Sequence, residues 1–259
     1  MTSDSIIADH WAGRIALVTG ATRGIGRAIA FGLAQSGAHV IAAGRTQGAL
    51  EELDDEIRKS TGERATLVPL DLREGDGVDR LGGVIHQRWG RLDIVVGAAG
   101  LLGVTTPLAH LDPAVWDQVV AVNLTANYRL IRSMDPLLRQ SPAGRVLFLT
   151  SVAARRPRAF WGVYGATKAG LEAMAAAYAE EVEHTGVRVA VVNPGPMRTV
   201  MRARAFPGED PMTLPAPDEI VPLALELTRP DLTPPQGVVS FHDWKAARQA
   251  EDQNAAGGG

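Results

Sequence analysis

The sequence predicts an α/β fold in which a parallel sheet lies between two layers of helices. Short apolar runs alternate with longer stretches of helical periodicity along most of the 259 residues. The apolar runs are nearly continuous, as is typical of strands buried on both faces. The first run, 14–20, ends at a glycine, and Ile25, Ile29 and Leu33 follow at helical spacing before Gly37. We therefore expect a doubly wound sheet of the Rossmann type.

The same alternation places the other elements. The expected strands are 14–20, 39–44, 65–71, 92–100, 144–151 and 187–195. After the first helix, the expected helices are 48–59, 78–89, 113–138, 164–183 and 218–227.

The chain has no linker rich in Pro, Gly or Ser that would divide it into domains. We expect one domain over 1–245 and a frayed C-terminal tail over 246–259, which ends in three glycines. The segment 196–217 contains five prolines and follows the sixth strand. It is expected to be a loop or short helices over the carboxyl ends of the strands, either a substrate lid or a structural connector.

Composition excludes several classes of function. With 26 basic and 29 acidic residues and no long run of like charge, the chain lacks a nucleic-acid arm or a membrane-surface patch. It has no cysteine, its six histidines show no metal-ligand spacing, and residues 1–11 lack the apolar core of a signal peptide. We expect a cytoplasmic protein without a metal, a nucleic-acid partner or a membrane partner.

The stretch "TGATRGIG" follows the first strand and opens the first helix. Glycines in this position allow a tight turn and let backbone N–H groups approach a pyrophosphate at the helix N-terminus. An ordinary strand-to-helix turn is the alternative, but the context favours dinucleotide binding. The expected contacts from this turn are Gly20, Thr22, Arg23, Gly24, Ile25 and Gly26.

Two arginines favour NADP(H) over NAD(H). The second strand is followed by Arg45, in the neighbourhood where many NAD-binding chains carry an acidic residue, and Arg23 lies within the glycine turn. Guanidiniums can clamp a 2′-phosphate that a carboxylate would repel. The alternative is that both arginines are solvated surface residues.

"VYGATKAG" places Tyr164 and Lys168 four residues apart, and therefore on one face of a helix. A core tyrosine and a lysine with a buried stem would give the same spacing. However, Ser151 ends the fifth strand thirteen residues earlier, at the sheet edge where doubly wound folds bind ligands. An ammonium about 4 Å from a phenol contributes roughly 4 kcal/mol at an effective dielectric of 20, so we expect Lys168 to bring the pKa of Tyr164 toward neutrality.

These motifs together resemble the short-chain dehydrogenase/reductase family, in its compact single-domain subgroup. The resemblance runs from Thr19 to the segment 236–243, which looks like the family's last strand. It implies the strand order 3-2-1-4-5-6-7 and a catalytic set of Ser151, Tyr164, Lys168 and Asn123. It also implies that Lys168 holds the nicotinamide ribose and that Asn123 kinks its helix to keep a water in the proton path. Further cofactor contacts implied by the family motifs are Asp71, Leu72, Ala99, Gly100, Tyr164, Lys168, Pro194, Gly195 and Thr199.

One motif departs from the family. The fourth strand ends "GAAG" at 97–100, where the family carries N-N-A-G, so two asparagine side chains are missing. We expect a local effect on stability and no loss of activity.

The residues between Ser151 and Tyr164, "ARRPRAFW", include three arginines and two aromatic residues. They can form a substrate wall that favours an acidic group and an apolar tail, with Trp161 as a substrate contact beside Ser151 and Tyr164. A solvated loop whose aromatic residues pack on the core or on a neighbouring subunit is the other interpretation. The alanine-rich helix over 164–183 permits close packing against a second copy, and the family resemblance implies a homodimer or homotetramer.

The leading hypothesis is an NADPH-dependent oxidoreductase that transfers a hydride between nicotinamide and a carbonyl or secondary alcohol. Tyr164 would be the general acid and Ser151 the second hydrogen-bond donor. Two alternatives remain open, a reductase of 3-oxoacyl groups on an acyl-carrier protein and a non-enzymatic NADP sensor or scaffold.

Overall fold

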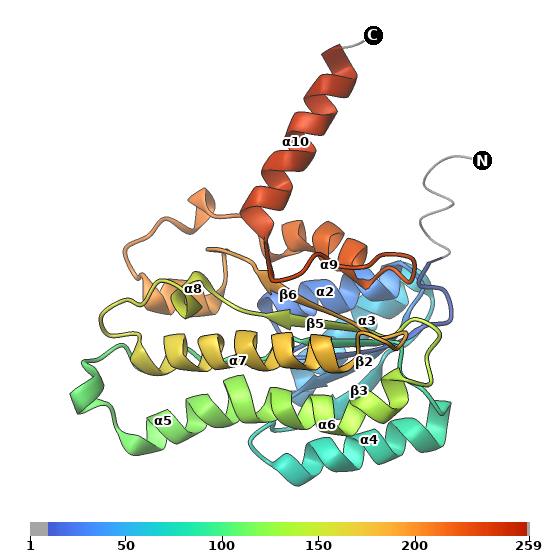
Figure 1. Cartoon of the computed structure of the whole chain (residues 1–259), viewed down its shortest axis with the longest axis horizontal. Coiled ribbons are helices and arrows are strands. Elements are labelled where there is room, and N and C mark those ends of the chain that lie inside the picture. The colour runs from blue at the N-terminus through green and yellow to red at the C-terminus, as the bar shows by residue number, and fades with distance from the viewer. Residues whose placement is uncertain (1–9, 258–259) are drawn as a thin grey trace.

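The computed structural model describes residues 10–257 and contains a seven-stranded sheet in the order β3-β2-β1-β4-β5-β6-β7 (Figure 1). All six strand pairs are parallel. The predicted fold and strand order are confirmed. The strands are β1 (Ile15–Thr19), β2 (His39–Gly44), β3 (Thr66–Pro69), β4 (Ile94–Gly97), β5 (Arg145–Leu149), β6 (Arg188–Asn193) and β7 (Val238–Ser240).

Helices cover both faces of the sheet (Figure 1). The longer ones are α2 (Gly24–Gln35), α3 (Gln47–Thr61), α4 (Gly75–Trp89), α5 (Pro113–Val120), α6 (Ala126–Leu138), α7 (Gly162–Glu181), α9 (Val221–Thr228) and α10 (Phe241–Gly257). The shorter ones are η1 (Leu108–His110), η2 (Ala121–Thr125), η3 (Val152–Ala154), α8 (Val200–Ala205), η4 (Pro211–Thr213) and η5 (Pro217–Ile220).

Alternation along β1 divides the apolar core into two layers. Ala16 and Val18 join the cluster that holds the apolar residues of α2, α3 and α9, whereas Ile15 and Leu17 join the cluster of α4, α6 and α7. Successive side chains of a strand point to opposite faces, so one apolar strand supplies both layers. In register, Thr19 lies opposite Ala43 of β2 and Gly97 of β4, so these three strands end at the same edge.

The helix predicted over 113–138 is not one regular helix. Between α5 and α6, residues Ala121–Thr125 form a π segment, η2, with Asn123 at its centre. Such an insertion widens one turn and is frequent at functional sites.

The C-terminal part differs from the sequence prediction. The last strand is shorter than the expected 236–243, because Phe241 already begins α10. Over 246–259, where the sequence predicts a frayed tail, α10 continues as a helix to Gly257, and residues 258–259 lie outside the described part. Helix α10 projects away from the sheet (Figure 1), and its first turns are held by Phe241, which is buried, and by Trp244, whose Nε1 donates to Glu226.

The segment 196–217 contains the short elements α8 and η4, and it ends where η5 begins. This agrees with the prediction of a loop or short helices. Within residues 10–257 the structure has no helix long and apolar enough to cross a membrane. The same residues include no cluster of three or more His, Asp or Glu side chains suited to a metal ion.

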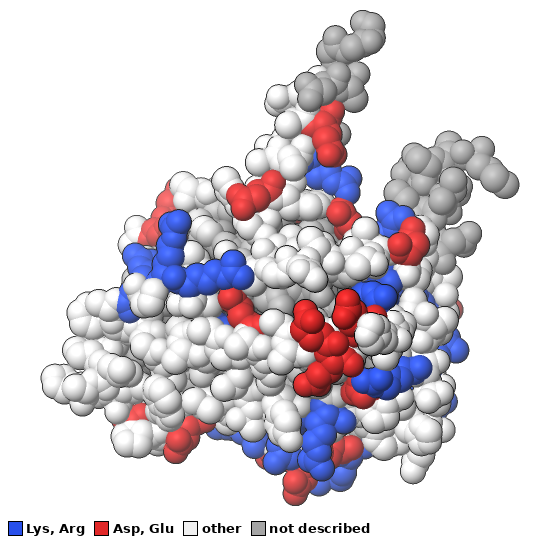
Figure 2. All heavy atoms as spheres, in the orientation of Figure 1, with Lys and Arg blue, Asp and Glu red and all other residues white. Residues whose placement is uncertain are grey.

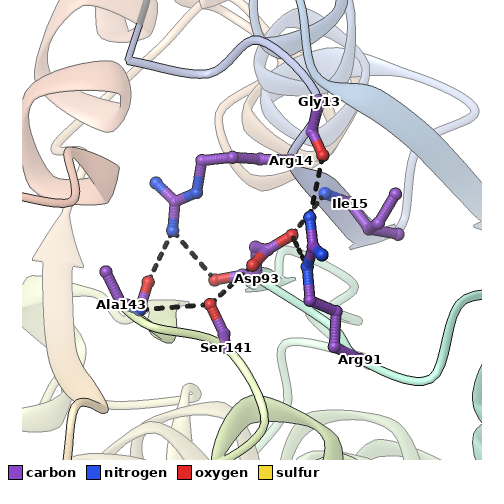
Figure 3. A network of polar contacts seen from close by, with 7 residues as sticks. All are labelled: Gly13, Arg14, Ile15, Arg91, Asp93, Ser141 and Ala143. Carbon is purple, nitrogen blue, oxygen red and sulfur yellow. Dashed lines mark hydrogen bonds and ion pairs between the residues drawn. The ribbon is translucent and has the colours of Figure 1, made fainter.

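A buried carboxylate joins three segments at the amino ends of the central strands (Figure 3). The Asp93 side chain, 3% exposed, accepts hydrogen bonds from the Ile15 backbone N–H at 2.8 Å and from the Ser141 hydroxyl at 2.5 Å. Arg91 lies 3.2 Å from the same carboxylate. These contacts tie β1 to the residues that precede β4 and β5.

Two buried arginines extend this network toward the C-terminal part. Arg14 donates to the carbonyls of Asp93, Ala143 and Thr228. Burial lowers the pKa of Arg145 to about 10, so its guanidinium stays charged at neutral pH. Among the described residues, Arg145 donates to five backbone carbonyls, those of Gly144, Gly186, Arg229, Pro230 and Leu232.

We predict that Asp93→Ala lowers the free energy of unfolding by about 2–4 kcal/mol, because it leaves buried donors without an acceptor. Urea denaturation followed by circular dichroism measures this change. Asp55→Ala is the matched control: Asp55 is an exposed acid on α3, so its loss should change stability by less than about 0.5 kcal/mol. Equal effects of the two variants would contradict the structural role of Asp93.

Candidate active site

A cavity of about 350 Å³ opens at the carboxyl ends of the strands. The chain leaves β1 toward β2 and β3 on one side and returns to β4 on the other, so β1 and β4 flank the point where the strand order reverses. Ligands of open α/β sheets bind at such points. The cavity is lined by all the predicted cofactor residues except Gly195, namely Gly20, Thr22, Arg23, Gly24, Ile25, Gly26, Arg45, Asp71, Leu72, Ala99, Gly100, Tyr164, Lys168, Pro194 and Thr199.

The glycine turn leaves no room for side chains where the backbone must approach. A Cβ on Gly20 would lie 2.8 Å from the Ala99 backbone, and one on Gly26 would lie 2.5 Å from the Gly20 carbonyl oxygen. Gly20 and Gly24 also have positive φ angles, 69° and 56°. The turn therefore presents bare backbone at the start of α2, and these residues fit the pyrophosphate of a dinucleotide.

Charged groups gather at the far end of this cavity, beyond β2 and β3. Arg73 holds the Asp71 carboxylate through its Nε, 3.0 Å from each oxygen. This hydrogen bond, with a smaller contribution from the positive charge of Arg45, keeps the pKa of Asp71 below its usual value. The Asp71 charge is therefore offset mainly by Arg73, and Arg45 lines the cavity without an ion pair to any of the described residues.

Ser151, Tyr164 and Lys168 meet at the end of β5. Ser151 follows this strand, and the other two side chains lie one turn apart on α7. Tyr164 hydrogen-bonds to Ser151, and the Lys168 Nζ donates to the Leu149 carbonyl at 2.8 Å. Tyr164 is 8% exposed and Lys168 is 4% exposed, so both polar groups are nearly removed from water.

Burial sets the pKa values of this pair. It raises the pKa of Tyr164 above its usual value, and the hydrogen bond with Ser151 only partly opposes the shift. It lowers the pKa of Lys168 to about 8. The expectation that Lys168 brings the phenol toward neutrality is wrong for the groups of this chain, because desolvation outweighs a cation whose Nζ lies 5.9 Å from the ring centroid. The phenol therefore keeps its proton at neutral pH.

The Asn123 side chain connects two walls of the site. It is fully buried, its Oδ1 accepts from the Leu101 N–H at 2.8 Å, and its Nδ2 donates to the Leu101 carbonyl at 2.9 Å. The same Nδ2 lies 3.1 Å from the Thr167 hydroxyl, which donates to the Tyr164 carbonyl. Asn123 thus fixes the segment after β4 relative to the helix that carries Tyr164 and Lys168.

At the "GAAG" end of β4, the side chain of Asn127 from α6 lies where Gly97 has no side chain. A Cβ on Gly97 would lie 2.5 Å from the Asn127 Oδ1 and 2.5 Å from the Phe148 ring. Asn127 comes from α6 and donates to the Asn123 carbonyl at 2.8 Å. An amide from the helix therefore fills the space that a larger side chain at the strand end would occupy.

Four predicted site residues do not line the cavity. Asn123 is hydrogen-bonded to Leu101 and Ser151 to Tyr164, and both of these partners line the cavity. Gly195 lies beside the lining residue Pro194. Trp161 packs edge-on against Tyr164, with ring centroids 5.8 Å apart. Sequence reasoning missed several lining residues, among them Arg198 and Met201. Their position within 196–217, the segment predicted to cover the strand ends, was the signal that could have identified them.

Comparisons with known proteins agree with this geometry. A family model for short chain dehydrogenases matches residues 14–210. The uncharacterized oxidoreductase YciK of Escherichia coli K12 is 41% identical over 220 residues, which cover 84% of this chain and 87% of that protein.

Solved structures show the same similarity. A short chain dehydrogenase from Shigella flexneri, complexed with NADP, superposes with a TM-score of 0.86 at 39% identity over 90% of this chain and 98% of its own. A short chain dehydrogenase from Escherichia coli CFT073, complexed with NADPH, gives a TM-score of 0.84 at 39% identity with the same coverage.

We predict that Gly97→Ala destabilises the chain by about 1–3 kcal/mol, because the added methyl group overpacks the contact with Asn127 and Phe148. Combining it with Asn127→Ala should cost less than the sum of the single changes, since one of the two clashing groups is removed. Thermal unfolding of the three variants tests this coupling. Gly83→Ala is the control, because a Cβ there meets nothing within 4 Å on an exposed helical turn and should be neutral or stabilising. Additive losses would refute the coupling.

Proposed function

The chain belongs to the short-chain dehydrogenase family, and on this premise we propose that it is an NADP(H)-dependent oxidoreductase acting on a carbonyl or secondary alcohol. One observation carries the proposal. A neutral, buried phenol, a hydroxyl and an ammonium converge from β5 and α7 beside a cavity that begins at a glycine turn. A protein that only sensed NADP would need the turn and Arg45, but not this convergence.

The residues around the cavity would hold the cofactor along its length. The glycine turn Gly20–Gly26 would bind the pyrophosphate, Asp71 and Leu72 would border the adenine, and Lys168 would reach the nicotinamide ribose. Ala99, Gly100, Pro194, Gly195 and Thr199 complete the proposed contacts. When bound, the cofactor supplies the hydride.

Side chains of the protein would stabilise the negative charge that develops on the substrate oxygen. As a carbonyl becomes an alcohol, negative charge grows on its oxygen, and Tyr164 would donate the proton while Ser151 donates a hydrogen bond. The raised pKa of Tyr164 suits this direction, because the phenol stays protonated at neutral pH. The Lys168 ammonium, with a pKa of about 8, is mostly charged at pH 7 and stabilises the phenolate left behind.

A preference for NADP(H) over NAD(H) is supported by charge. Arg23 and Arg45 both line the cavity, and the nearby Asp71 carboxylate is already neutralised by Arg73. A 2′-phosphate would therefore meet two guanidiniums and little opposing charge. Two similar chains are complexed with NADP and NADPH, which supports binding of NADP(H) at this site.

Reduction of a 3-oxoacyl group on a carrier protein remains the second candidate, because it uses the same three groups. A cytoplasmic location and a homodimer or homotetramer remain predictions from the sequence. A panel of ketones, aldehydes, quinones and oxoacyl thioesters, read by NADPH consumption, would separate these activities from a non-enzymatic role.

We predict that Tyr164→Phe lowers turnover with any accepted carbonyl by about 10²–10⁴-fold, because the proton donor is lost. NADPH affinity, measured by fluorescence titration, should stay within about threefold, since a ring of the same shape remains. Tyr128→Phe is the matched control: Tyr128 is 52% exposed on α6 and should be dispensable. Retained turnover in Tyr164→Phe would refute the catalytic assignment.

We predict that Arg45→Asp reduces the ratio of kcat/KM for NADPH to that for NADH by at least about tenfold. A charge-assisted hydrogen bond to phosphate is lost and a repulsive carboxylate is introduced, which together exceed about 1.4 kcal/mol. Arg58→Asp, at an exposed position of α3, makes the same charge change away from the cavity and should leave the ratio unchanged. An unchanged ratio in Arg45→Asp would mean that this side chain does not read the phosphate.

A further inference from the structure

The turn that precedes the catalytic tyrosine is strained. Phe160 has a φ of 72°, which bulky side chains rarely adopt, and it is 56% exposed, so packing of its own side chain does not explain the conformation. Two backbone hydrogen bonds hold the turn, from the Thr106 N–H to the Phe160 carbonyl and from the Trp161 N–H to the Arg158 carbonyl. Strain of this kind persists where the surrounding structure enforces it and is concentrated at functional sites.

The strained turn brings Arg158 beside an aromatic wall. The Trp161 ring packs edge-on against Tyr164, with centroids 5.8 Å apart, and lies 5.7 Å from the Phe206 ring, which follows α8. The Arg158 guanidinium lies over both outer rings, 5.7 Å from Trp161 and 5.4 Å from Phe206. The wall thus leads from the proton donor to a cation and joins the α7 turn to the segment 196–217.

Arg158 differs from Arg155 and Arg202, which lie close to it, in its charge balance. Arg155 is paired with Glu172 and Arg202 with Glu209. No carboxylate of the described residues lies within 4 Å of Arg158, which is exposed, and basic side chains gather over α8 on this face (Figure 2). A guanidinium stacked on rings still presents its N–H edge in plane, where a carboxylate can bind through two hydrogen bonds.

We propose that Arg158 binds a carboxylate on the substrate whose carbonyl is reduced at Tyr164, with an apolar or aromatic body lying against Trp161 and Phe206. This inference rests on the proposed function and names its substrate class. The Arg158 guanidinium carbon lies at most about 11.5 Å from the Tyr164 ring centre, as the two centroid distances through Trp161 require.

The reaction of a simple probe of this class balances without a further reactant. 4-Formylbenzoate, NADPH and a proton give 4-(hydroxymethyl)benzoate and NADP⁺. A C–H bond forms at the carbonyl carbon from the hydride, and an O–H bond forms with the Tyr164 proton, which solvent replaces. 4-Formylbenzamide is the neutral analogue of nearly the same shape.

The first test compares both aldehydes in wild type and in Arg158→Gln. We expect kcat/KM for 4-formylbenzoate to fall at least about tenfold in the variant, mainly through KM, and kcat/KM for 4-formylbenzamide to change less than twofold. Comparing the two ratios removes the difference in intrinsic reactivity of the aldehydes. Arg158→Lys should restore part of the loss. Arg204→Gln, which removes an equal charge from exposed α8, should leave the preference intact and so excludes general electrostatic attraction.

The second test needs no turnover. Saturation-transfer NMR in the presence of NADPH should detect 4-(hydroxymethyl)benzoate bound to wild type and not to Arg158→Gln, with a weaker, unchanged signal from 4-(hydroxymethyl)benzamide. If the anionic probe bound only when Arg158 was present, but no carbonyl compound led to NADPH consumption, the proposed function would be refuted and the carboxylate site supported. The carboxylate site would be overturned if NADPH were consumed with no Arg158-dependent preference for the anion. It would also be overturned if the anionic probe neither reacted nor bound. In both cases the proposed reductase activity would still be tested by the panel of carbonyl compounds.

Discussion

The buried amide of Asn123 is the contact on which the site depends. It lies in the π segment, where the widened turn lets its side chain satisfy both backbone groups of Leu101 and the hydroxyl of Thr167. Through Thr167 it reaches the carbonyl of Tyr164, and through its own carbonyl it receives Asn127. One side chain therefore sets the distance between the end of β4 and the helix that carries Tyr164 and Lys168.

The buried polar network that stabilises the fold and the candidate active site lie at opposite edges of the same sheet. At the amino ends of the strands, Asp93, Arg14 and Arg145 are buried with their hydrogen bonds satisfied, and they tie the C-terminal segment to the central strands. At the carboxyl ends, Lys168 and Tyr164 are buried where desolvation disfavours their charged forms, as their shifted pKa values show. The chain can sustain such groups at one edge because the other edge holds the strands in place.

The sequence predicted what depends on local pattern. Apolar runs predicted the strands, the glycine turn predicted one wall of the cavity, and the four-residue spacing predicted that Tyr164 and Lys168 lie together. It could not predict features that depend on distant partners. The family resemblance implied a helix kink at Asn123, but not the contact of its amide with Leu101, 22 residues away. Gly97 is matched by Asn127 from another element, and the pKa of Tyr164 follows from burial that spacing does not reveal.

One half of the proposed site is formed mainly by backbone and the other by side chains. This difference explains why family membership predicts a reaction but not a substrate. The proposed cofactor half is largely backbone, shaped by glycines whose added Cβ atoms would collide with neighbouring backbone. The proposed substrate half is made of side chains, Trp161 from a strained turn and Phe206 from the segment after α8, which meet only in the folded chain. Backbone recognition tolerates sequence change, whereas a wall of side chains changes with each substitution. The turn before Tyr164 and the segment 196–217 are therefore where this chain would acquire its own specificity.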